Sequence, residues 1–401
     1  MAPFHPTTFR RQFPALQQTG IYLDSAATAL KPQAVIDATQ QFYAKESGSV
    51  HRSQHSSARD VTARFELARQ HAATLVNAAS AQEMVWVRGT TEAINLVAQS
   101  YARPRLQPGD QILVSEAEHH ANLIPWLMVA QQTGAQVVKL PIGDDYLPDL
   151  TCLANLLNKS TKILALSQMS NVTGGQPNLA LAIQLAHAAD VRVVVDGAQG
   201  IVHCPVDVQQ LDIDFYAFSA HKLYGPSGIG ALYGKSELLK DMAPWQGGGK
   251  MLTHASFSGF TPQKAPHCFE AGTPNIAGVL GLGAVLEWLA GQDWRAAEQH
   301  SSALADYAEQ QLQQLPGWRS FRCSNASLLA FNIAGLHPGD IATLLAEQNV
   351  AVRAGQHCAQ PLMAALGIEG CVRASFAPYN SAEEVEAFVQ AMIKVVELLA
   401  D

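Results

Sequence analysis

Charged residues and long apolar runs are both scarce in this chain of 401 residues. Charged residues make up 15% of it, the formal net charge is -8, and no block of Lys and Arg occurs. A nucleic-acid-binding surface needs clustered positive charge, so the composition argues against this class of function. The most hydrophobic stretch, residues 276–290, is short, rich in Gly and interrupted by Glu287. It predicts a buried helix and not a membrane span.

Targeting, disulfide and metal motifs are also missing. The first ten residues contain no apolar segment, so we expect no secretory signal. The six cysteines include no CxxC pair, which argues against a disulfide framework or a zinc site. His51 and His55 have the i, i+4 spacing of a zinc motif but lack its glutamate. We therefore expect a cytoplasmic protein with free thiols, no metal and no membrane partner.

Seven short apolar runs recur through the middle of the chain, and helical patterns separate most of the earlier ones. This alternation predicts an α/β fold with a mostly parallel sheet that is covered on both faces. The expected strands are 84–87, 111–114, 136–140, 162–166, 192–195, 215–218 and 229–233. Helical periodicity predicts helices at 32–45, 57–76, 92–101, 121–133, 150–157, 179–189 and 276–289, and a brief strand is expected at 21–24.

The end of the chain predicts a second, smaller α/β unit. We expect helices at 296–314, 341–348 and 382–399, and strands at 328–333, 350–353 and 372–376. The Gly- and Pro-rich segment 247–274 is expected to form loops. We assign residues 20–290 to a large domain, and residues 1–19 and 291–401 to a small one.

The segment SAHKLYGP at residues 219–226 joins the last two expected strands. Its Lys222 lies in a Gly/Pro turn between two strands that we expect to be buried, which is a poor place for a solvated charge. A lysine in apolar surroundings loses basicity and becomes an amine nucleophile toward carbonyl groups. The alternative is a lysine that extends from a strand end into solvent. The residues alone leave both readings open.

Polar groups follow the other strands at the edge where α/β sheets bind ligands. Thr90 and Thr91 open a helix and offer hydroxyls to a phosphate, although an ordinary helix cap explains them equally well. His119 and Asn171 follow two further strands, and Asp196 ends a nearly continuous apolar one. A carboxylate there is costly unless it has a positive partner. Together with Lys222, these groups fit pyridoxal phosphate.

Cys358 differs from the other cysteines, at 152, 204, 268, 323 and 371, which we interpret as structural. It lies in a polar Gly/Gln/His turn before a helix expected to begin near Leu362, a setting that lowers a thiol pKa. Arg373, on the strand 372–376, is either a structural ion-pair partner or a clamp for a substrate carboxylate.

Many ordered motifs carry a family resemblance over essentially the whole chain. The chain resembles the pyridoxal-phosphate-dependent cysteine desulfurases of group II, the branch that includes selenocysteine lyases and cysteine sulfinate desulfinases. The motifs are YLDSAA at 22–27, VHR at 50–52, RGTTE at 88–92, EHHAN at 118–122, SNV at 170–172, VDGAQ at 195–199, SAHKLYGP at 219–226, EAGTPN at 270–275, RAGQHCAQP at 353–361 and RAS at 373–375.

The resemblance implies a fold-type I architecture with a seven-stranded sheet, a homodimer, and a role for each matching residue. Lys222 would bond covalently to the cofactor, Asp196 would pair with its ring nitrogen, and His119 would stack on the ring. Cys358 would be the nucleophile that becomes a persulfide, carried by the small domain. Phosphate ligands would be Thr90, Thr91, Ser219 and His221, with Thr273 from the other subunit; Gln199 and Asn171 would lie near the ring oxygen; Arg373 and Arg353 would bind substrate; and His51 and Arg52, from the other subunit, would lie at its entrance.

One position departs from the family pattern, because Gln356 stands where many group II members have His. This makes the chain similar to the sulfinate-desulfinase-like branch and leaves open which acceptor protein receives the sulfur. The resemblance implies conversion of L-cysteine to L-alanine, with activity on L-selenocysteine and L-cysteine sulfinate. The alternatives are an aminotransferase or β-lyase on the same fold, which would not need Cys358, and a non-catalytic carrier with a defective cofactor site.

Overall fold

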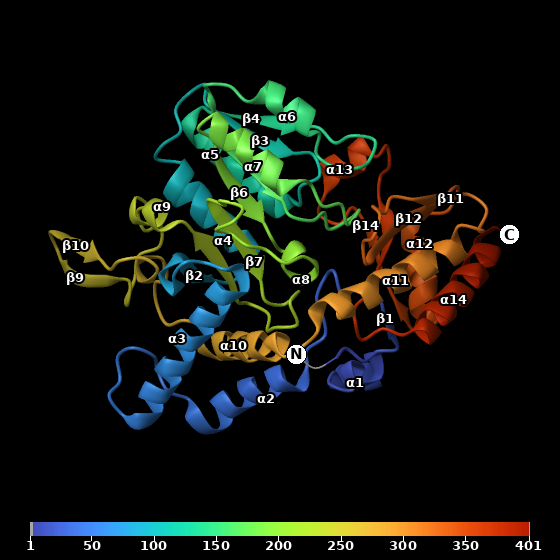
Figure 1. Cartoon of the computed structure of the whole chain (residues 1–401), viewed down its shortest axis with the longest axis horizontal. Coiled ribbons are helices and arrows are strands. Elements are labelled where there is room, and N and C mark those ends of the chain that lie inside the picture. The colour runs from blue at the N-terminus through green and yellow to red at the C-terminus, as the bar shows by residue number, and fades with distance from the viewer. Residues whose placement is uncertain (1–2, 401) are drawn as a thin grey trace.

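A seven-stranded sheet forms the centre of the molecule (Figure 1), in a computed structural model that describes residues 3–400. The strand order is β2-β8-β7-β6-β5-β3-β4. All neighbours are parallel except β8, which is antiparallel to both β2 and β7. The strands are β2 (Met84–Val87), β3 (Gln111–Ser115), β4 (Gln136–Leu140), β5 (Thr161–Ser167), β6 (Arg192–Asp196), β7 (Phe215–Ser219) and β8 (Gly230–Gly234). The predicted fold class and all seven predicted strands are confirmed.

Alternate residues of these strands enter two different apolar clusters. In β6, Val193 and Val195 belong to one cluster and Val194 to the other. The first cluster also contains Phe65 of α3 (Ser56–Val76), and the second contains Trp126 of α5 (Ile124–Thr133). Successive side chains of a strand point to opposite faces, and helices cover both faces here, so the strands read as continuous apolar runs.

Several of the remaining helices of this part of the chain connect or cover the strands, while those at residues 6–10 and 33–41 lie at the bottom of Figure 1, away from the sheet. The remaining helices are α1 (Pro6–Arg10), α2 (Gln33–Gln41), α4 (Thr90–Leu96), α6 (Leu150–Leu156), α7 (Leu179–Ala188), α8 (Gly200–His203), α9 (Ser236–Lys240) and α10 (Ile276–Ala290). Within residues 3–400, no helix is both long and apolar enough to cross a membrane.

A second sheet of four antiparallel strands lies near the C-terminus, in the order β11-β12-β15-β14. Its strands are β11 (Trp318–Ser320), β12 (Leu328–Ile333), β14 (Arg353–Gly355) and β15 (Cys371–Ser375). The helices of this unit are α11 (Trp294–Leu312), α12 (Pro338–Glu347), α13 (Gln360–Ala365) and α14 (Ala382–Ala400). The predicted smaller C-terminal α/β unit is confirmed.

Two details of the sequence-based assignment are wrong. The strand expected at 350–353 is split into β13 (Val350–Ala351), which pairs with β1 (Ile21–Tyr22), and β14. The segment expected to be all loop contains a hairpin of β9 (Leu252–Ser256) and β10 (Gly259–Pro262). This hairpin projects from the molecule (Figure 1) and is largely exposed, so no alternating apolar pattern marked its strands.

The division into residues 20–290 and a small domain of residues 1–19 with 291–401 stays a prediction. Phe9 packs in the largest apolar cluster, with its ring centroid 5.3 Å from that of Trp288. Leu23 is buried in the cluster of the C-terminal sheet, and Ile21 pairs with Val350. The first part of the chain therefore contributes to both cores.

Candidate active site

The carboxyl ends of the central strands open into a pocket of about 400 Å³. It also receives residues from the C-terminal sheet, so segments far apart in the sequence line one cavity. Most of the predicted site residues are among its lining. They are Thr90, Thr91, His119, Asn171, Asp196, Gln199, Ser219, His221, Lys222, Arg353, Cys358 and Arg373.

At one end of the pocket, three hydroxyl-bearing residues come together. The Oγ of Ser219, the last residue of β7, accepts a hydrogen bond from the Thr90 amide at 2.8 Å and lies 2.8 Å from Thr90 Oγ1. Gly89 makes this approach possible, because a Cβ there would lie 3.0 Å from Ser219 Oγ. Thr91 and His221 line the same pocket. This set of donors suits a phosphate group.

Lys222 lies in the turn after β7. The turn is closed by a 2.9 Å hydrogen bond from the Gly225 amide to the Ala220 carbonyl, and Tyr224 takes a left-handed backbone conformation with φ of 60°. Burial lowers the pKa of Lys222 to about 8, against the opposing effect of the Asp196 carboxylate. A neutral amine is therefore present near neutral pH, which favours the reactive lysine over the solvent-extended one.

Asp196 ends β6 and is almost fully buried. Asp196 Oδ1 accepts a hydrogen bond of 2.9 Å from the Ala198 amide. Burial raises the pKa of Asp196, with Lys222 as the one positive group that opposes this shift. The carboxylate form is therefore favoured by any cation placed in the pocket beside it.

His119 follows β3 and accepts a hydrogen bond from the Ala121 amide at Nδ1, at 3.0 Å. Burial, and then the charge of Lys222, lowers the pKa of His119 to about 4. The imidazole is therefore neutral at physiological pH, with its proton on Nε2. The preceding Glu118 is fully buried and accepts hydrogen bonds from the Ser167 amide and from Asn122. Burial raises the pKa of Glu118 to about 8.

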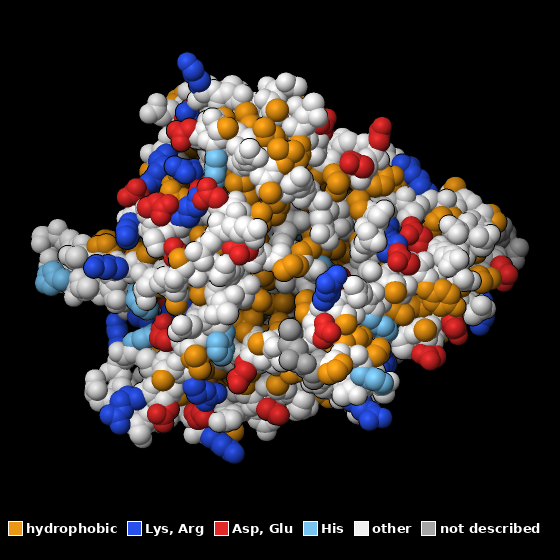
Figure 2. Space-filling view, viewed as in Figure 1, with side chains coloured by type: hydrophobic (Ala, Val, Ile, Leu, Met, Phe, Trp, Pro, Cys, Tyr) orange, Lys and Arg blue, Asp and Glu red, His pale blue; other side chains and the backbone are white. Residues whose placement is uncertain are grey.

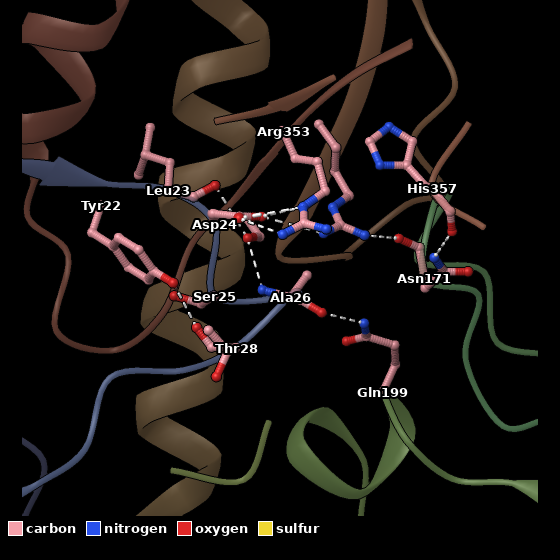
Figure 3. Close-up of polar contacts among 12 residues, drawn as sticks. Tyr22, Leu23, Asp24, Ser25, Ala26, Thr28, Asn171, Gln199, Arg353 and His357 are labelled. Atoms are coloured by element: carbon pink, nitrogen blue, oxygen red, sulfur yellow. Dashed lines mark hydrogen bonds and ion pairs between the residues drawn. The ribbon is translucent and has the colours of Figure 1, made fainter. Parts of the chain in front are cut away.

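Two arginines share one carboxylate beside the pocket. Figure 3 shows Arg353 directed at Asp24, with 3.1 Å between Nη2 and Oδ2. Arg373 Nη2 lies 3.4 Å from Asp24 Oδ1, and its Nη1 donates to the Asn171 carbonyl at 2.7 Å. Its Nε is buried with no partner in the described part of the chain. One carboxylate cannot neutralise two guanidinium groups, so the pair retains positive charge for an anionic substrate.

Cys358 presents an exposed thiol in a turn that is held at several points. The Cys358 carbonyl accepts from the His120 amide at 2.7 Å, and the His357 carbonyl accepts from Asn171 Nδ2 at 2.9 Å (Figure 3). Both His357 and Cys358 have left-handed φ values, 51° and 54°. Such a conformation is costly for residues with side chains and persists only where its surroundings impose it. The turn therefore fixes the position of the thiol.

The buried thiols contrast with this exposed one. Burial raises the pKa of Cys204 and Cys371 to about 12 and that of Cys268 to about 11. A thiol with a raised pKa is a poor nucleophile near neutral pH. Cys358 is thus the cysteine of the described residues that combines exposure with a place in the pocket.

Three predicted site residues do not line this pocket: His51, Arg52 and Thr273. All three are exposed. His51 pairs with Glu66 at 2.8 Å, the Arg52 guanidinium lies beside Gly249, and the Gly249 carbonyl accepts from the Gly272 amide at 2.8 Å. They therefore gather on the surface, apart from the pocket of their own chain.

Sequence reasoning assigned no role to Asp24, Glu118 or His357. Asp24 lay within a quoted motif, and Glu118 and His357 adjoin predicted residues, so adjacency was the available signal. His357 is buried and donates from Nε2 to the Cys371 carbonyl at 3.0 Å. Burial lowers the pKa of His357 to about 3.

Comparison with known proteins agrees with this fold. The family model described as aminotransferase class V matches residues 21–388. The protein therefore belongs to the aminotransferase class V family, whose members use pyridoxal phosphate as cofactor.

Individual relatives narrow the family further. The cysteine desulfurase CsdA of Escherichia coli is 64% identical over 401 residues, covering 100% of both chains. A probable cysteine desulfurase of Vibrio cholerae is 51% identical, covering 97% of this chain and 98% of its own. The crystal structure of E. coli CsdA with an S-sulfonic acid matches with a TM-score of 0.95 and 63% identity, over 99% of this chain and 100% of that one. A cysteine desulfurase from Thermococcus onnurineus matches with a TM-score of 0.94 and 34% identity, over 99% and 100%. The chain belongs to the cysteine desulfurases of the aminotransferase class V family.

The residues present fit pyridoxal phosphate. Asp196 is a buried carboxylate without a full positive partner, as a protonated ring nitrogen requires. Lys222 offers an amine of lowered pKa to the aldehyde, and Thr90 and Ser219 offer donors to the phosphate. His119 and Gln199 line the same pocket.

Proposed function

We propose that the chain converts L-cysteine to L-alanine and passes the sulfur through a persulfide on Cys358. The observation that carries this proposal is that Lys222 and Cys358 line one pocket although they follow strands of different sheets, β7 and β14. Lys222 supplies the amine that a pyridoxal-phosphate enzyme needs. Cys358 is a nucleophile that an aminotransferase or a β-lyase has no use for.

Within the pocket, each residue has a task in this proposal. Arg373 binds the substrate carboxylate, and Arg353 stands beside it as a second positive group. Pyridoxal phosphate, held by Lys222 and Asp196, would supply an electron sink for the substrate Cα. The neutral form of the Lys222 amine takes the Cα proton at Nζ. His119 donates or accepts a further proton at Nε2.

In the second step, the sulfur atom passes from the substrate to Cys358. The Cys358 thiolate attacks the substrate Sγ, an S–S bond forms, and the C–S bond breaks. The electron pair of that bond stays with the substrate, whose Cβ takes up one proton. Cα then regains the proton held by Lys222, and alanine leaves. The fixed turn of Cys358 supports this step, because the thiol does not have to be ordered when substrate binds.

The same pocket supports activity on L-selenocysteine and L-cysteine sulfinate. Both offer the carboxylate and amino groups that Arg373 and Lys222 would meet. In both, the group on Cβ leaves more readily than a thiol, so we expect Cys358 to matter less for them.

The surroundings of this reaction are part of the proposal. Two features support a homodimer: His51, Arg52 and Thr273 lie outside the pocket of their own chain and are exposed, ready to meet another subunit. The exposed Cys358 turn supports transfer to a sulfur-acceptor protein that reaches into the pocket. Six free cysteines support a reducing compartment, the cytoplasm.

The test is alanine formation from cysteine, cysteine sulfinate and selenocysteine by the wild type, Lys222→Ala, Cys358→Ala and the control Cys152→Ala. We expect Lys222→Ala to lose activity on all three substrates, together with the visible absorbance of the bound cofactor. Cys358→Ala should keep that absorbance and lose most activity on cysteine. Full activity of Cys358→Ala on cysteine would refute the persulfide role, and a keto acid product would favour an aminotransferase.

A further inference from the structure

A second cavity of about 910 Å³ shares no lining residue with the active-site pocket. It is a cleft between the C-terminal part of α3, α8, the end of α10 and the start of α11. Figure 2 shows hydrophobic side chains gathered in a hollow below the centre of the molecule, where Figure 1 has α8 above α10. Nothing in the proposed reaction uses this cleft.

The walls of the cleft are mainly apolar. Leu75 comes from α3, Ile201 from α8, Leu286 from α10 and Trp294 from α11, with Leu223 between them. Cavities of about 300–1,000 Å³ with apolar walls and a few directed polar groups are typical of small-molecule sites. The volume and the walls of this cleft have that character.

One carboxylate in the cleft lacks part of its hydrogen bonding. Glu298 Oε1 lies 2.8 Å from His203 Nδ1, and Ser327 Oγ lies 3.1 Å from the same nitrogen. Glu298 Oε2 is buried with no hydrogen-bond partner among residues 3–400. His71, from α3, also lines this cleft, and its buried Nδ1 has no partner in the same residues. A buried oxygen of a carboxylate is costly until a donor reaches it.

The charges around the cleft favour a cation. Its lining contains the carboxylates of Glu287 and Glu298 and one permanent positive group, Arg295; Glu287 and Arg295 are exposed, and Glu298 is half-buried. An anionic ligand would meet two like charges, whereas a protonated amine would give Glu298 Oε2 a charge-assisted hydrogen bond.

We propose that this cleft is a binding site for a small ligand that joins an apolar body to a protonated amine. The apolar body packs against Leu75, Ile201 and Leu286. The ammonium group donates to Glu298 Oε2. The site is distinct from the cofactor pocket and does not depend on the proposed reaction.

The cleft also adjoins the active site through short connections. Gln199, which lines the cofactor pocket, directly precedes α8, and His203 at the end of α8 lines the cleft. Leu223 of the cleft follows Lys222 in the chain. Trp294 donates from Nε1 to the Val202 carbonyl at 2.7 Å, which ties α11 to α8.

The experiment uses the holoenzyme and a tertiary amine, because a primary amine would react with the cofactor. The probes are N,N-dimethyl-4-phenylbutylamine, the neutral 4-phenylbutanol and the anionic 4-phenylbutanoate, each measured by calorimetry and by saturation-transfer NMR. The variants are Glu298→Gln, Leu289→Trp, which fills the cleft from a half-buried position, and the control Glu347→Gln on the exposed side of α12.

We expect the amine to bind the wild type at least about tenfold more tightly than the alcohol, since charged hydrogen bonds differ from neutral ones by that order. The Glu298→Gln variant should lose about that factor for the amine and keep its affinity for the alcohol. Leu289→Trp should abolish binding of both, and Glu347→Gln should bind like the wild type. Equal affinity for amine and alcohol, unchanged affinity in Glu298→Gln, or no binding of any probe would each overturn the proposal. Because Lys222 and Cys358 are untouched, desulfurase activity remains a separate readout.

Discussion

At the scale of residues, the proposed chemistry rests on two side chains with unusual surroundings, Lys222 and Cys358. Burial favours the neutral amine of Lys222. The fixed turn of Cys358 exposes its thiol, whereas the other five cysteines are buried or half-buried. Each effect is a matter of solvation. A lysine inside an apolar fold loses its proton more easily, and a thiol at a pocket surface can be reached by substrate.

The lowered pKa of Lys222 makes a prediction about pH. In protein freed of cofactor, the fraction of neutral amine rises as the pH passes through about 8, not through its ordinary value. The rate at which added pyridoxal phosphate bonds to the protein, followed by visible absorbance, should therefore rise with a midpoint near that pH. N-acetyl-lysine methyl amide under the same conditions is the control, and should keep gaining rate above it. A profile identical to that of the control would contradict the role of burial.

At the scale of elements, the proposed cofactor site depends on how closely β7, β8 and the loop before α4 approach one another. Gly230 begins β8 opposite Ser219. A Cβ at Gly230 would lie 2.4 Å from the Phe218 carbonyl oxygen and 2.8 Å from Gly89 Cα. These are backbone atoms that cannot move without displacing the Thr90–Ser219 contact.

We therefore expect Gly230→Ala to destabilise the fold by about 1–3 kcal/mol, the usual cost of overpacking, and to weaken retention of pyridoxal phosphate. Thermal unfolding of the holoenzyme and the rate of cofactor loss on dialysis measure the two effects. The matched control is Gly247→Ala, where a Cβ would meet nothing within 4 Å. Two variants with the same melting temperature and the same cofactor loss would show that the close approach is unimportant.

At the scale of the whole molecule, the sequence predicted much of the architecture but fewer of the contacts between the residues of the site. All seven central strands were visible because strands that are buried on both faces of a sheet are continuous apolar runs. The hairpin of β9 and β10 was missed because its pairing rests on backbone hydrogen bonds and leaves no apolar pattern. Asp24 gained its contact with Arg373 only through folding, since the two are 349 residues apart in the chain.

The quaternary arrangement is testable through mixed dimers. If Thr273 acts in the pocket of the other subunit, Thr273→Glu should hold phosphate poorly, and Lys222→Ala should lack the covalent anchor. In a mixed dimer, the pocket that keeps Lys222 would receive an intact Thr273 from its neighbour. Mixing and refolding the two inactive variants should therefore restore activity at one site of each mixed dimer. A mixture that shows dimers in light scattering but remains inactive would contradict this arrangement.

The central claim is that substrate sulfur passes through Cys358. The most direct measurement is peptide mass spectrometry of the enzyme after incubation with L-cysteine in the absence of any acceptor or reductant. We predict that the peptide containing Cys358 gains the mass of one sulfur atom, that this mass is lost on reduction, and that the peptides of Cys204 and Cys371 stay unchanged. Alanine formation with an unmodified Cys358 peptide, or with the added sulfur on another cysteine, would contradict the account.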